Sequence, residues 1–354
     1  MTRPEESVRR STAASPAVVE RLVAEVLGEV RAHAVCRSFV LPQGPEGAEV
    51  RRAELALALA AVLFDDVQQR VPMARAYVED AVRAGEPLVL DHGALRTVLG
   101  PDTGALPPGS AAFTRILEPL GYRRAGTYPL DRLGMTGYAY AHVDAPEAVP
   151  QYFVSELHPE RFSGPFQAAV DRVMGTSVDP LVPRDVDKLE ALARHGALPR
   201  EAAAALLPAL VRAFGRHHDA PALDDYEALR AESAEMAWIS TEGNAFNHAT
   251  DRVADVFAVA DAQKALGRPM KEAVEVSNNG NVMQTAFRAA TRQALLRGPD
   301  GHMVVRDVPG SFHEMITRKA LVDGTLDLTF DAGNATSIFK MTDGAGDGAS
   351  KETA

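Results

Sequence analysis

The sequence predicts an α+β fold in which one β-α-β-β-β module occurs twice and the two copies build a central curved sheet. Segments of strand-like and helical pattern follow the same order in residues 87–163 and in residues 241–341. The first strand of each copy also carries the motif H-x-x-x-R, in residues 92–96 and in residues 248–252. Between the copies, residues 164–240 are rich in Ala and Leu at helical spacing, which predicts a helical insertion.

The region before the first module predicts helices that pack on this core. Residues 1–16 mix charged and hydroxyl side chains, so we expect a flexible start. Residues 17–86 predict helices, the first with an apolar stripe formed by Val18, Leu22, Val26 and Val30. Proline and glycine residues between Pro42 and Gly47 divide this region into separate helices.

Each module is expected to contain its elements in a defined order. The first has a strand over 87–98, a helix from about Ser110 to Gly121, and strands over 123–130, 137–143 and 151–157. The second has a strand over 245–253, a helix over 254–266, and strand-like segments over 270–276, 282–289 and 303–316, the last with a Pro-Gly break. Residues 342–354 predict a disordered tail.

The amino-acid composition limits the kinds of molecule that the protein is expected to bind and the compartment in which we expect it. The chain of 354 residues has 46% hydrophobic residues, enough for a large core, and a formal net charge of -11. That charge disfavours nucleic acid and anionic membranes as partners. Cys36 is the only cysteine, so no intramolecular disulfide can form. The longest apolar run, residues 55–64, is too short to span a bilayer, and the N-terminus lacks the apolar stretch of a signal peptide, so we expect a cytoplasmic protein.

The repeated motif suggests one central site. Side chains four apart on a strand share a face, so each histidine should point to the same side as the arginine of its motif. Two modules packed face to face would therefore direct His92, His248, Arg96 and Arg252 at one cavity. The last strand of the second copy adds Glu314. Two imidazoles and one carboxylate can hold a mononuclear iron(II) ion, Fe(2+), and leave positions open for a chelating 2-oxo acid and dioxygen.

The same residues are also compatible with roles that involve no metal. A lone histidine in a strand is more often a hydrogen-bonded core or surface residue than a ligand. Glu314 could pair with Arg318 or face solvent. Glu156, in the last strand of the first copy, could be a fourth ligand, a partner for Arg96 or Arg252, or exposed.

Two rival constellations have the H-x-D/E…H spacing of other iron sites. One comprises His158, Glu160 and His195, and the other comprises His217, His218, Asp219 and His248. The first lies in a proline-containing turn that predicts a loop. The second follows a predicted helix, where histidines cap the last carbonyl groups. Residues 277–281 predict a hairpin turn and no phosphate loop, because they lack the lysine and the following helix.

Four motifs together resemble one known family. They are LDHGALRT at residues 90–97, FNHAT at residues 246–250, VMQTAF at residues 282–287 and SFHEMITR at residues 311–318. In this order they look like the 2-oxoadipate dioxygenase/decarboxylase family, also called 2-hydroxyglutarate synthase, over about residues 20–341. The resemblance implies the vicinal-oxygen-chelate fold, which agrees with the duplicated module.

The resemblance also implies a reaction and a set of residues. By family pattern His92, His248 and Glu314 would bind iron(II), and Arg96 would hold a substrate carboxylate. The family converts 2-oxoadipate and dioxygen into 2-hydroxyglutarate and carbon dioxide, a step in bacterial lysine breakdown. We further expect Gln284 to hydrogen-bond the substrate and Arg252 to contact it. The C-terminal segment 330–339 matches the family only in part, and in it we expect the substrate contacts Gly333, Asn334 and Phe339.

Two rival functions remain, one a different enzyme and the other a binding protein. A redox-silent metal isomerase or lyase, similar to the glyoxalases of the same superfamily, would be favoured by Glu156 as a fourth ligand. A protein that binds an anionic small molecule without turnover would show tight ligand binding and no product under any metal.

Overall fold

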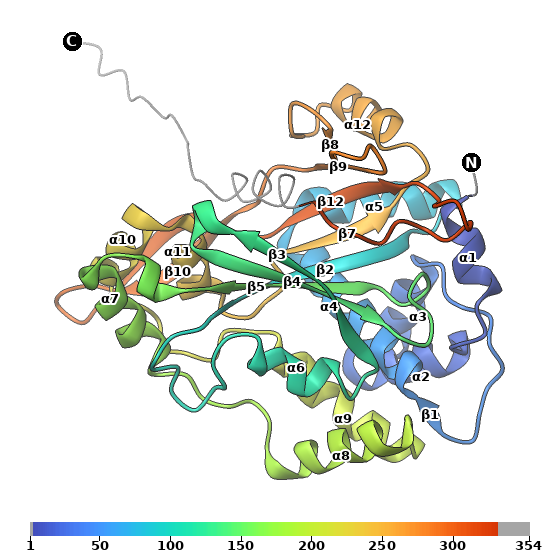
Figure 1. The fold of residues 1–354 in the computed structure, drawn as a ribbon, viewed down its shortest axis with the longest axis horizontal. Coiled ribbons are helices and arrows are strands. Elements are labelled where there is room, and N and C mark those ends of the chain that lie inside the picture. Colours follow the sequence, from blue (N-terminus) through green and yellow to red (C-terminus); the bar gives the residue numbers. More distant parts are fainter. Residues whose placement is uncertain (1–2, 332–354) are drawn as a thin grey trace.

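The computed structural model describes residues 3–331, and within them the two modules lie side by side in one eight-stranded sheet of order β3-β4-β5-β2-β7-β12-β9-β8 (Figure 1). The first module consists of β2 (Val89–Val98), α6 (Ala111–Leu117), β3 (Tyr122–Leu130), β4 (Met135–His142) and β5 (Gln151–Leu157). The second consists of β7 (His248–Arg252), α12 (Val256–Ala265), β8 (Glu275–Val276), β9 (Val282–Ala286) and β12 (Phe312–Arg318). The duplicated module and the α+β class predicted from the sequence are therefore confirmed.

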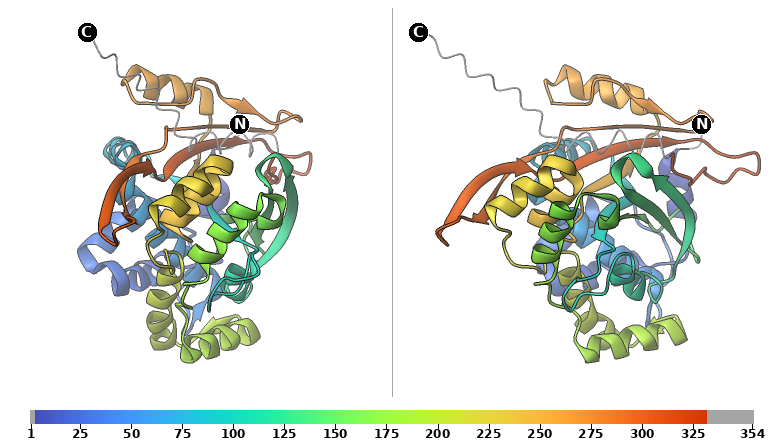
Figure 2. Two further views of the ribbon diagram at one scale, coloured as in Figure 1. Left: turned by 90° about the vertical axis from the view of Figure 1, so that its left-hand side faces the viewer. Right: turned by 60° about the vertical axis from the view of Figure 1, so that its left-hand side comes forward.

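An additional hairpin interrupts the second module. β10 (Thr291–Arg297) and β11 (Met303–Pro309) pair with each other in a separate two-stranded sheet, before the chain returns to the main sheet as β12. The sequence pattern predicts strand over 303–316 but none over 291–297, so it does not reveal this hairpin. The second module also extends outwards, because α12 lies at the edge of the molecule beside β8 and β9 in every view of Figures 1 and 2.

The two modules are related by an approximate two-fold axis between their first strands. β2 and β7 run antiparallel, with Ala94 opposite His248 and His92 opposite Thr250. Each of these strands has the last strand of its own module, β5 or β12, as its parallel neighbour. The first strands therefore occupy the middle of the sheet, which brings the two motif histidines close together. The register shifts by a bulge between Leu90 and His92.

The register shows which residues of the last strands correspond. In the first module Ala94 lies opposite Phe153, and in the second Thr250 lies opposite Glu314. Since Ala94 and Thr250 each follow their histidine by two residues, Phe153 occupies the place of Glu314. Glu156 lies three positions further along its strand and on the other face, so it does not point to the same cavity as Glu314, as a fourth ligand would have to.

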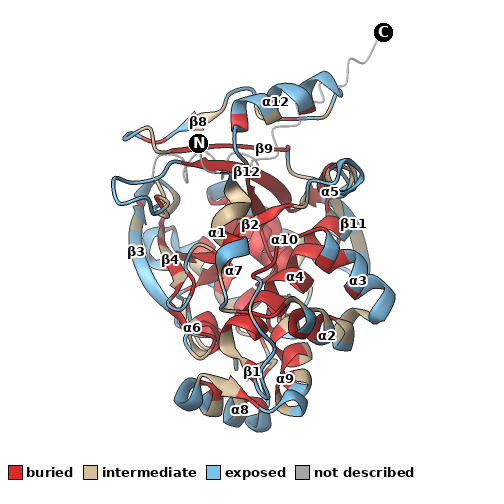
Figure 3. Cartoon of the chain, turned by 90° about the vertical axis from the view of Figure 1, so that its right-hand side faces the viewer, coloured by how far each residue is buried: buried red, intermediate tan, exposed pale blue. Residues whose placement is uncertain are grey.

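One face of the sheet packs on a central buried helix. α4 (Arg52–Arg70) is buried continuously from residue 53 to residue 65, as expected for a helix enclosed on all sides (Figure 3). Leu95, Ala249 and Met315, from the three central strands, join its hydrophobic cluster. The alternate residues of the same strands, among them His92 and Glu314, therefore face away from α4.

The remaining helices surround this core. N-terminal to the sheet lie α1 (Pro4–Arg10), α2 (Pro16–Leu27), α3 (Glu29–Arg37), β1 (Val50–Arg51) and α5 (Pro72–Ala84). The stripe predicted to continue to Val30 stops earlier: Gly28 has φ 76° and ends α2, and Val30 is 88% exposed. No helix among residues 3–331 has the length and apolarity needed to cross a membrane.

The segment between the modules wraps the core and reaches the sheet. It contains α7 (Gly164–Met174), α8 (Pro183–His195), β6 (Ala197–Leu198), α9 (Arg200–Ala213), α10 (Leu223–Glu232) and α11 (Ala234–Glu242), and two short 3-10 helices, η1 (Asp131–Leu133) and η2 (Pro159–Arg161), precede it. β6 pairs with β1, which ties the segment to the N-terminal helices. α7 and α11 pack with Val98 and Leu157, at the ends of two central strands, so the segment contributes a wall beside the cavity face.

Candidate metal centre

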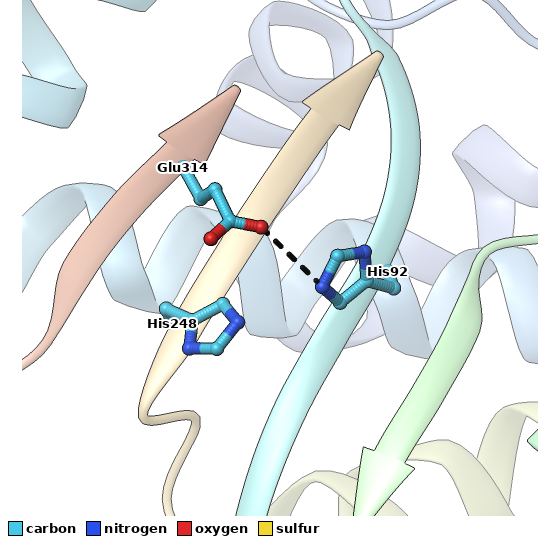
Figure 4. Close-up of side chains that lie close together, drawn as sticks. All are labelled: His92, His248 and Glu314. Carbon is cyan, nitrogen blue, oxygen red and sulfur yellow. Dashed lines mark ion pairs between the residues drawn. The ribbon is translucent and has the colours of Figure 1, made fainter. Parts of the chain in front are cut away.

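Three buried side chains from three adjacent strands converge on the face of the sheet opposite α4. His92 lies on β2, His248 on β7 and Glu314 on β12, and one possible ligand atom of each lies within 4.8 Å of the others (Figure 4). His92 Nε2 is 3.7 Å from Glu314 Oε1. The glycine after His92 makes room for an aromatic ring, since a Cβ on Gly93 would lie 2.3 Å from the ring of Phe246.

Each histidine ring is held through its Nδ1 atom. His92 Nδ1 lies 2.8 Å from Asp91 Oδ1, and His248 Nδ1 lies 3.2 Å from Asn247 Oδ1. Because these oxygens can only accept, each Nδ1 carries the proton and each Nε2 keeps its lone pair. A neutral imidazole binds a metal through a nitrogen that keeps its lone pair, so Nε2 is the candidate ligand atom of both rings.

Burial shifts all three groups towards neutrality. It raises the pKa of Glu314 to about 8, opposed by Lys271 and supported by Glu275. It lowers the pKa of His92, although Asp91 acts in the opposite direction. Burial and the neighbouring His92 hold the pKa of His248 well below its usual range. Two neutral imidazoles beside a buried carboxyl group are a donor set that a divalent cation would satisfy.

The cluster opens into a cavity whose empty volume is about 440 Å³ when the open solvent at its mouth is included. Its lining consists of His92, Ala94, Leu95, Arg96, Phe153, Ser155, Asn247, His248, Gln284, Glu314, Phe330 and Asp331. Arg96 is 1% exposed, and its guanidinium lies 5.0 Å from the centre of the Trp238 ring on α11. Gln284 Nε2 donates to Glu314 Oε2 at 3.4 Å. The cavity therefore combines a candidate metal group, one cation and an apolar wall.

Arg252 does not take part in this lining. Its Nε donates to Asp91 Oδ2 at 3.0 Å, and both side chains are buried. The bulge before His92 brings Asp91 to this position. The structure therefore does not bring Arg252 to the cavity where a substrate contact was expected, because its guanidinium pairs with Asp91. Arg318 also pairs with Asp91, at 2.9 Å, and not with Glu314.

Glu156 has a structural partner away from the cluster. Its Oε2 accepts from the backbone N–H of Ser110 at 2.6 Å, and its Oε1 accepts from the hydroxyl of Tyr138 at 3.3 Å. It is not a fourth ligand and it pairs with neither Arg96 nor Arg252.

The two rival constellations do not form within residues 3–331. His158 Nε2 lies 2.8 Å from Thr136 Oγ1, on a different part of the fold from His195. His217 Nε2 lies 3.3 Å from the carbonyl oxygen of Ala213, as expected for a residue at a helix end, whereas His218 contacts the carbonyl oxygens of Asp219 at 2.9 Å and of Ile239 at 3.2 Å. His92, His248 and Glu314 are the one group of at least three such donors in the described part of the chain.

Some site residues were not predicted from the sequence. Asp91 and Asn247 had a signal, since each directly precedes a motif histidine in its own copy. Trp238 had none, because nothing in the spacing of the inserted helices connects it with Arg96. The expected contacts Gly333, Asn334 and Phe339 lie outside the described residues, and the tail 342–354 does as well.

A sheet made of two modules related by a two-fold axis, with two histidines and one glutamate at its centre, defines a protein of the vicinal-oxygen-chelate class with a candidate metal site. A family model described as 2-oxoadipate dioxygenase/decarboxylase matches residues 56–340, and the chain belongs to this family. No match was found among curated protein sequences.

Solved structures agree with this assignment. A glyoxalase-superfamily protein from Ralstonia eutropha JMP134 is 55% identical, with 90% of this chain and 99% of that chain covered and a TM-score of 0.87. The hydroxyglutarate synthase from Oryza sativa, in complex with 2-oxoadipate, is 18% identical, covers 85% of this chain and 97% of its own, and gives a TM-score of 0.63. The hydroxyglutarate synthase from Pseudomonas putida is 19% identical, with coverages of 84% and 75% and a TM-score of 0.60. At these identities, the two synthases show a shared fold.

Proposed function

We propose that this protein is an iron(II)-dependent dioxygenase that oxidatively decarboxylates and hydroxylates 2-oxoadipate, or a close 2-oxo acid, to 2-hydroxyglutarate and carbon dioxide. The observation that carries the proposal is the buried group of His92, His248 and Glu314 at the base of a cavity that also contains Arg96. The family assignment supports it, as does the 2-oxoadipate bound to the Oryza sativa relative.

The donor set is compatible with iron(II). His92, His248 and Glu314 would hold the ion, which would supply Lewis acidity and oxygen activation while leaving positions open for the substrate. Gln284 would keep the carboxylate of Glu314 in place through its hydrogen bond.

Arg96 has the properties needed to hold a substrate carboxylate. It is the only lysine or arginine among the described residues that line the cavity. Its planar guanidinium can bind a carboxylate through two parallel hydrogen bonds. Because the chain has a net charge of -11, the attraction for an anion must come from such a local cation.

The apolar side of the cavity would exclude water and position the carbon chain of the substrate. Ala94, Phe153 and Phe330 form one hydrophobic cluster there. Phe153 occupies the position in the first module that Glu314 occupies in the second. The second module would therefore contribute a metal ligand there, and the first an apolar wall.

The test is oxygen consumption by anaerobically purified, iron(II)-loaded protein on addition of 2-oxoadipate, with carbon dioxide and 2-hydroxyglutarate measured in the same vessel. We expect one dioxygen consumed for each carbon dioxide released. His248→Ala should abolish iron binding and turnover together, while His217→Ala, at a helix end, should retain both. Uptake with other 2-oxo acids only would keep the reaction class and change the substrate. An absence of uptake with every 2-oxo acid, despite bound iron, would contradict the proposal.

A second candidate follows from the Ralstonia eutropha structure, whose name places it in the glyoxalase superfamily. A redox-silent isomerase or lyase would use the same three ligands without dioxygen. Turnover with zinc or nickel under anaerobic conditions, and none with iron, would favour this candidate. The position of Glu156 counts against a four-ligand centre of that kind.

A further inference from the structure

In each module the residue directly before the candidate ligand histidine contacts the ring of that histidine. Asp91 Oδ1 is 2.8 Å from His92 Nδ1, and Asn247 Oδ1 is 3.2 Å from His248 Nδ1. Neighbouring residues of a regular strand point to opposite faces, so this contact requires a local departure from strand geometry. The bulge before His92 provides it in the first module, and Asn247 precedes the start of β7 in the second.

We propose that Asp91 and Asn247 are positioning residues of the metal centre, and that they make the two histidines unequal ligands. A carboxylate behind an imidazole fixes its orientation and raises its basicity, whereas a neutral amide fixes the orientation only. His92 would therefore be the stronger donor to the metal. This inference rests on the proposed function, since it concerns the same metal site.

The surroundings of Asp91 are built to hold a carboxylate in one orientation. Arg252 Nε donates to Oδ2 at 3.0 Å, and Arg318 donates to Oδ2 through Nε and to Oδ1 through Nη2, both at 2.9 Å. The two arginines come from β7 and β12, the strands that carry the other two ligands. All three side chains are buried, so these charge-assisted bonds are protected from water. Oδ1, which accepts from Arg318 Nη2, is also the oxygen that accepts from His92 Nδ1.

A second buried carboxylate–histidine pair provides a matched control. Asp251 Oδ1 lies 2.7 Å from His313 Nε2, and its Oδ2 accepts from the hydroxyl of Tyr77 at 3.1 Å. Both side chains lie on the side of the sheet that packs on α4, opposite the side of the candidate metal group, and the ring of His313 contacts Phe64 there. An isosteric change at Asp251 therefore removes the charge of an equally buried pair without touching the metal group.

The experiment measures cobalt(II) binding to the full chain, by competition with a chelator and by the visible absorption bands that report ligand geometry. We expect Asp91→Asn to weaken binding by about 10- to 100-fold and to shift the bands. Asp251→Asn should leave the affinity and the bands of the folded protein unchanged. Equal losses in both variants, or no loss in Asp91→Asn, would overturn the inference.

Asp91→Asn leaves two buried arginines with less compensation and so could fail to fold. Asn247→Ala then tests the inference at the other histidine, where no ion pair is disturbed, and we expect a loss of cobalt(II) affinity smaller than about 10-fold together with shifted bands. Wild-type affinity and bands in this variant would overturn the inference. Wild-type protein and His248→Ala are measured alongside: if these two bind cobalt(II) equally, it is the proposed metal site that fails, and not the role of Asp91 and Asn247.

Discussion

Arg96 and Arg252 occupy equivalent places in the two modules but have different surroundings. Each follows its histidine by four residues. Arg96 lines the cavity above Trp238, whereas Arg252 is neutralised by Asp91. The difference arises because the first module has a bulge and a carboxylate before its histidine, and the second module has an amide there. Arg252 therefore binds Asp91, the residue that contacts the ring of His92, whereas Arg96 lines the candidate substrate cavity.

This difference predicts unequal effects of the same substitution. Arg96→Lys keeps the charge but loses the two-point geometry, so we expect KM for 2-oxoadipate to rise about 10- to 100-fold, the equivalent of one charge-assisted hydrogen bond. Arg252→Lys keeps a cation near Asp91 and should raise KM less. Steady-state kinetics on both variants, at matched iron content, measures the two KM values that are compared. A larger effect at Arg252 would restore it as the substrate contact.

At the scale of elements, Glu156 connects the last strand of the first module with the start of α6. Its carboxylate accepts the backbone N–H of Ser110, one of the N–H groups that a helix cannot satisfy internally, and the hydroxyl of Tyr138 on β4. Its Cδ and Oε2 atoms fill the space where a Cβ on Gly109 would lie, which explains the glycine before Ser110. Through these contacts Glu156 stabilises the loop before α6 and the start of that helix.

We therefore expect Glu156→Gln to lower the free energy of unfolding by about 1–2 kcal/mol, since a charge-assisted bond to a partly buried N–H becomes a neutral one. The iron affinity should equal that of the wild type. Urea denaturation and chelator competition measure the two quantities. A loss of iron affinity without a loss of stability would indicate that Glu156 is a metal ligand.

The segment after β12 covers the candidate metal group. Arg318 Nη1 donates to the carbonyl oxygens of Asp327 and Thr329, at 2.8 and 2.7 Å, and thereby holds the backbone that leads to Phe330. The centre of the Phe330 ring lies 4.9 Å from that of His92, and the guanidinium of Arg318 lies 5.1 Å from the Phe330 ring. Arg318 thus contacts both Asp91, which lies behind the ligand His92, and the segment whose end lines the cavity.

Replacing Phe330 with alanine should change substrate selection more than metal binding. The lost apolar contact is that of a half-buried ring, so we expect KM for 2-oxoadipate to rise about 10-fold, and bulkier 2-oxo acids to become better substrates. Cobalt(II) affinity should stay within about threefold, because the ring supplies no ligand. Phe162→Ala, at an aromatic pair outside the cavity lining, is the control. An unchanged order of preference among 2-oxo acids would show that Phe330 does not shape the pocket.

At the scale of the whole molecule, the repeat could be predicted because each module carries its own pattern of strands and helices within a continuous stretch of sequence. The periodicity of each module and the H-x-x-x-R motif predict paired modules, and the family motifs point to the same three ligands that the sheet brings together. What could not be predicted depends on tertiary partners. β10 alternates buried and exposed residues only because Ala294 and Leu296 pack on Tyr226 and Ala237 of the inserted helices. Trp238 reaches Arg96 for the same reason.

The joint between the N-terminal helices and the first module contains a buried histidine. Arg52 of α4 forms a two-point ion pair with Asp144, at 2.7 and 2.5 Å. His142, at the end of β4, lies beside this pair, its Nδ1 accepts from the backbone N–H of Asp144, and its ring contacts Tyr122. Burial lowers the pKa of His142 to about 4, opposed by Asp144 and supported by Arg52. The folded protein therefore keeps this ring neutral where an unfolded chain would protonate it.

This shift predicts how stability depends on pH. Between about pH 6.5 and pH 4 the unfolded chain binds the proton and the folded protein does not, so the free energy of unfolding falls as the pH is lowered through this range. At about pH 5 the loss from His142 is on the order of 2 kcal/mol relative to about pH 7.5. Urea denaturation at the two pH values should show this part of the loss disappearing in His142→Gln, and persisting in His302→Gln, whose ring is exposed. An identical pH dependence in His142→Gln and wild type would mean that the joint tolerates a charged imidazole.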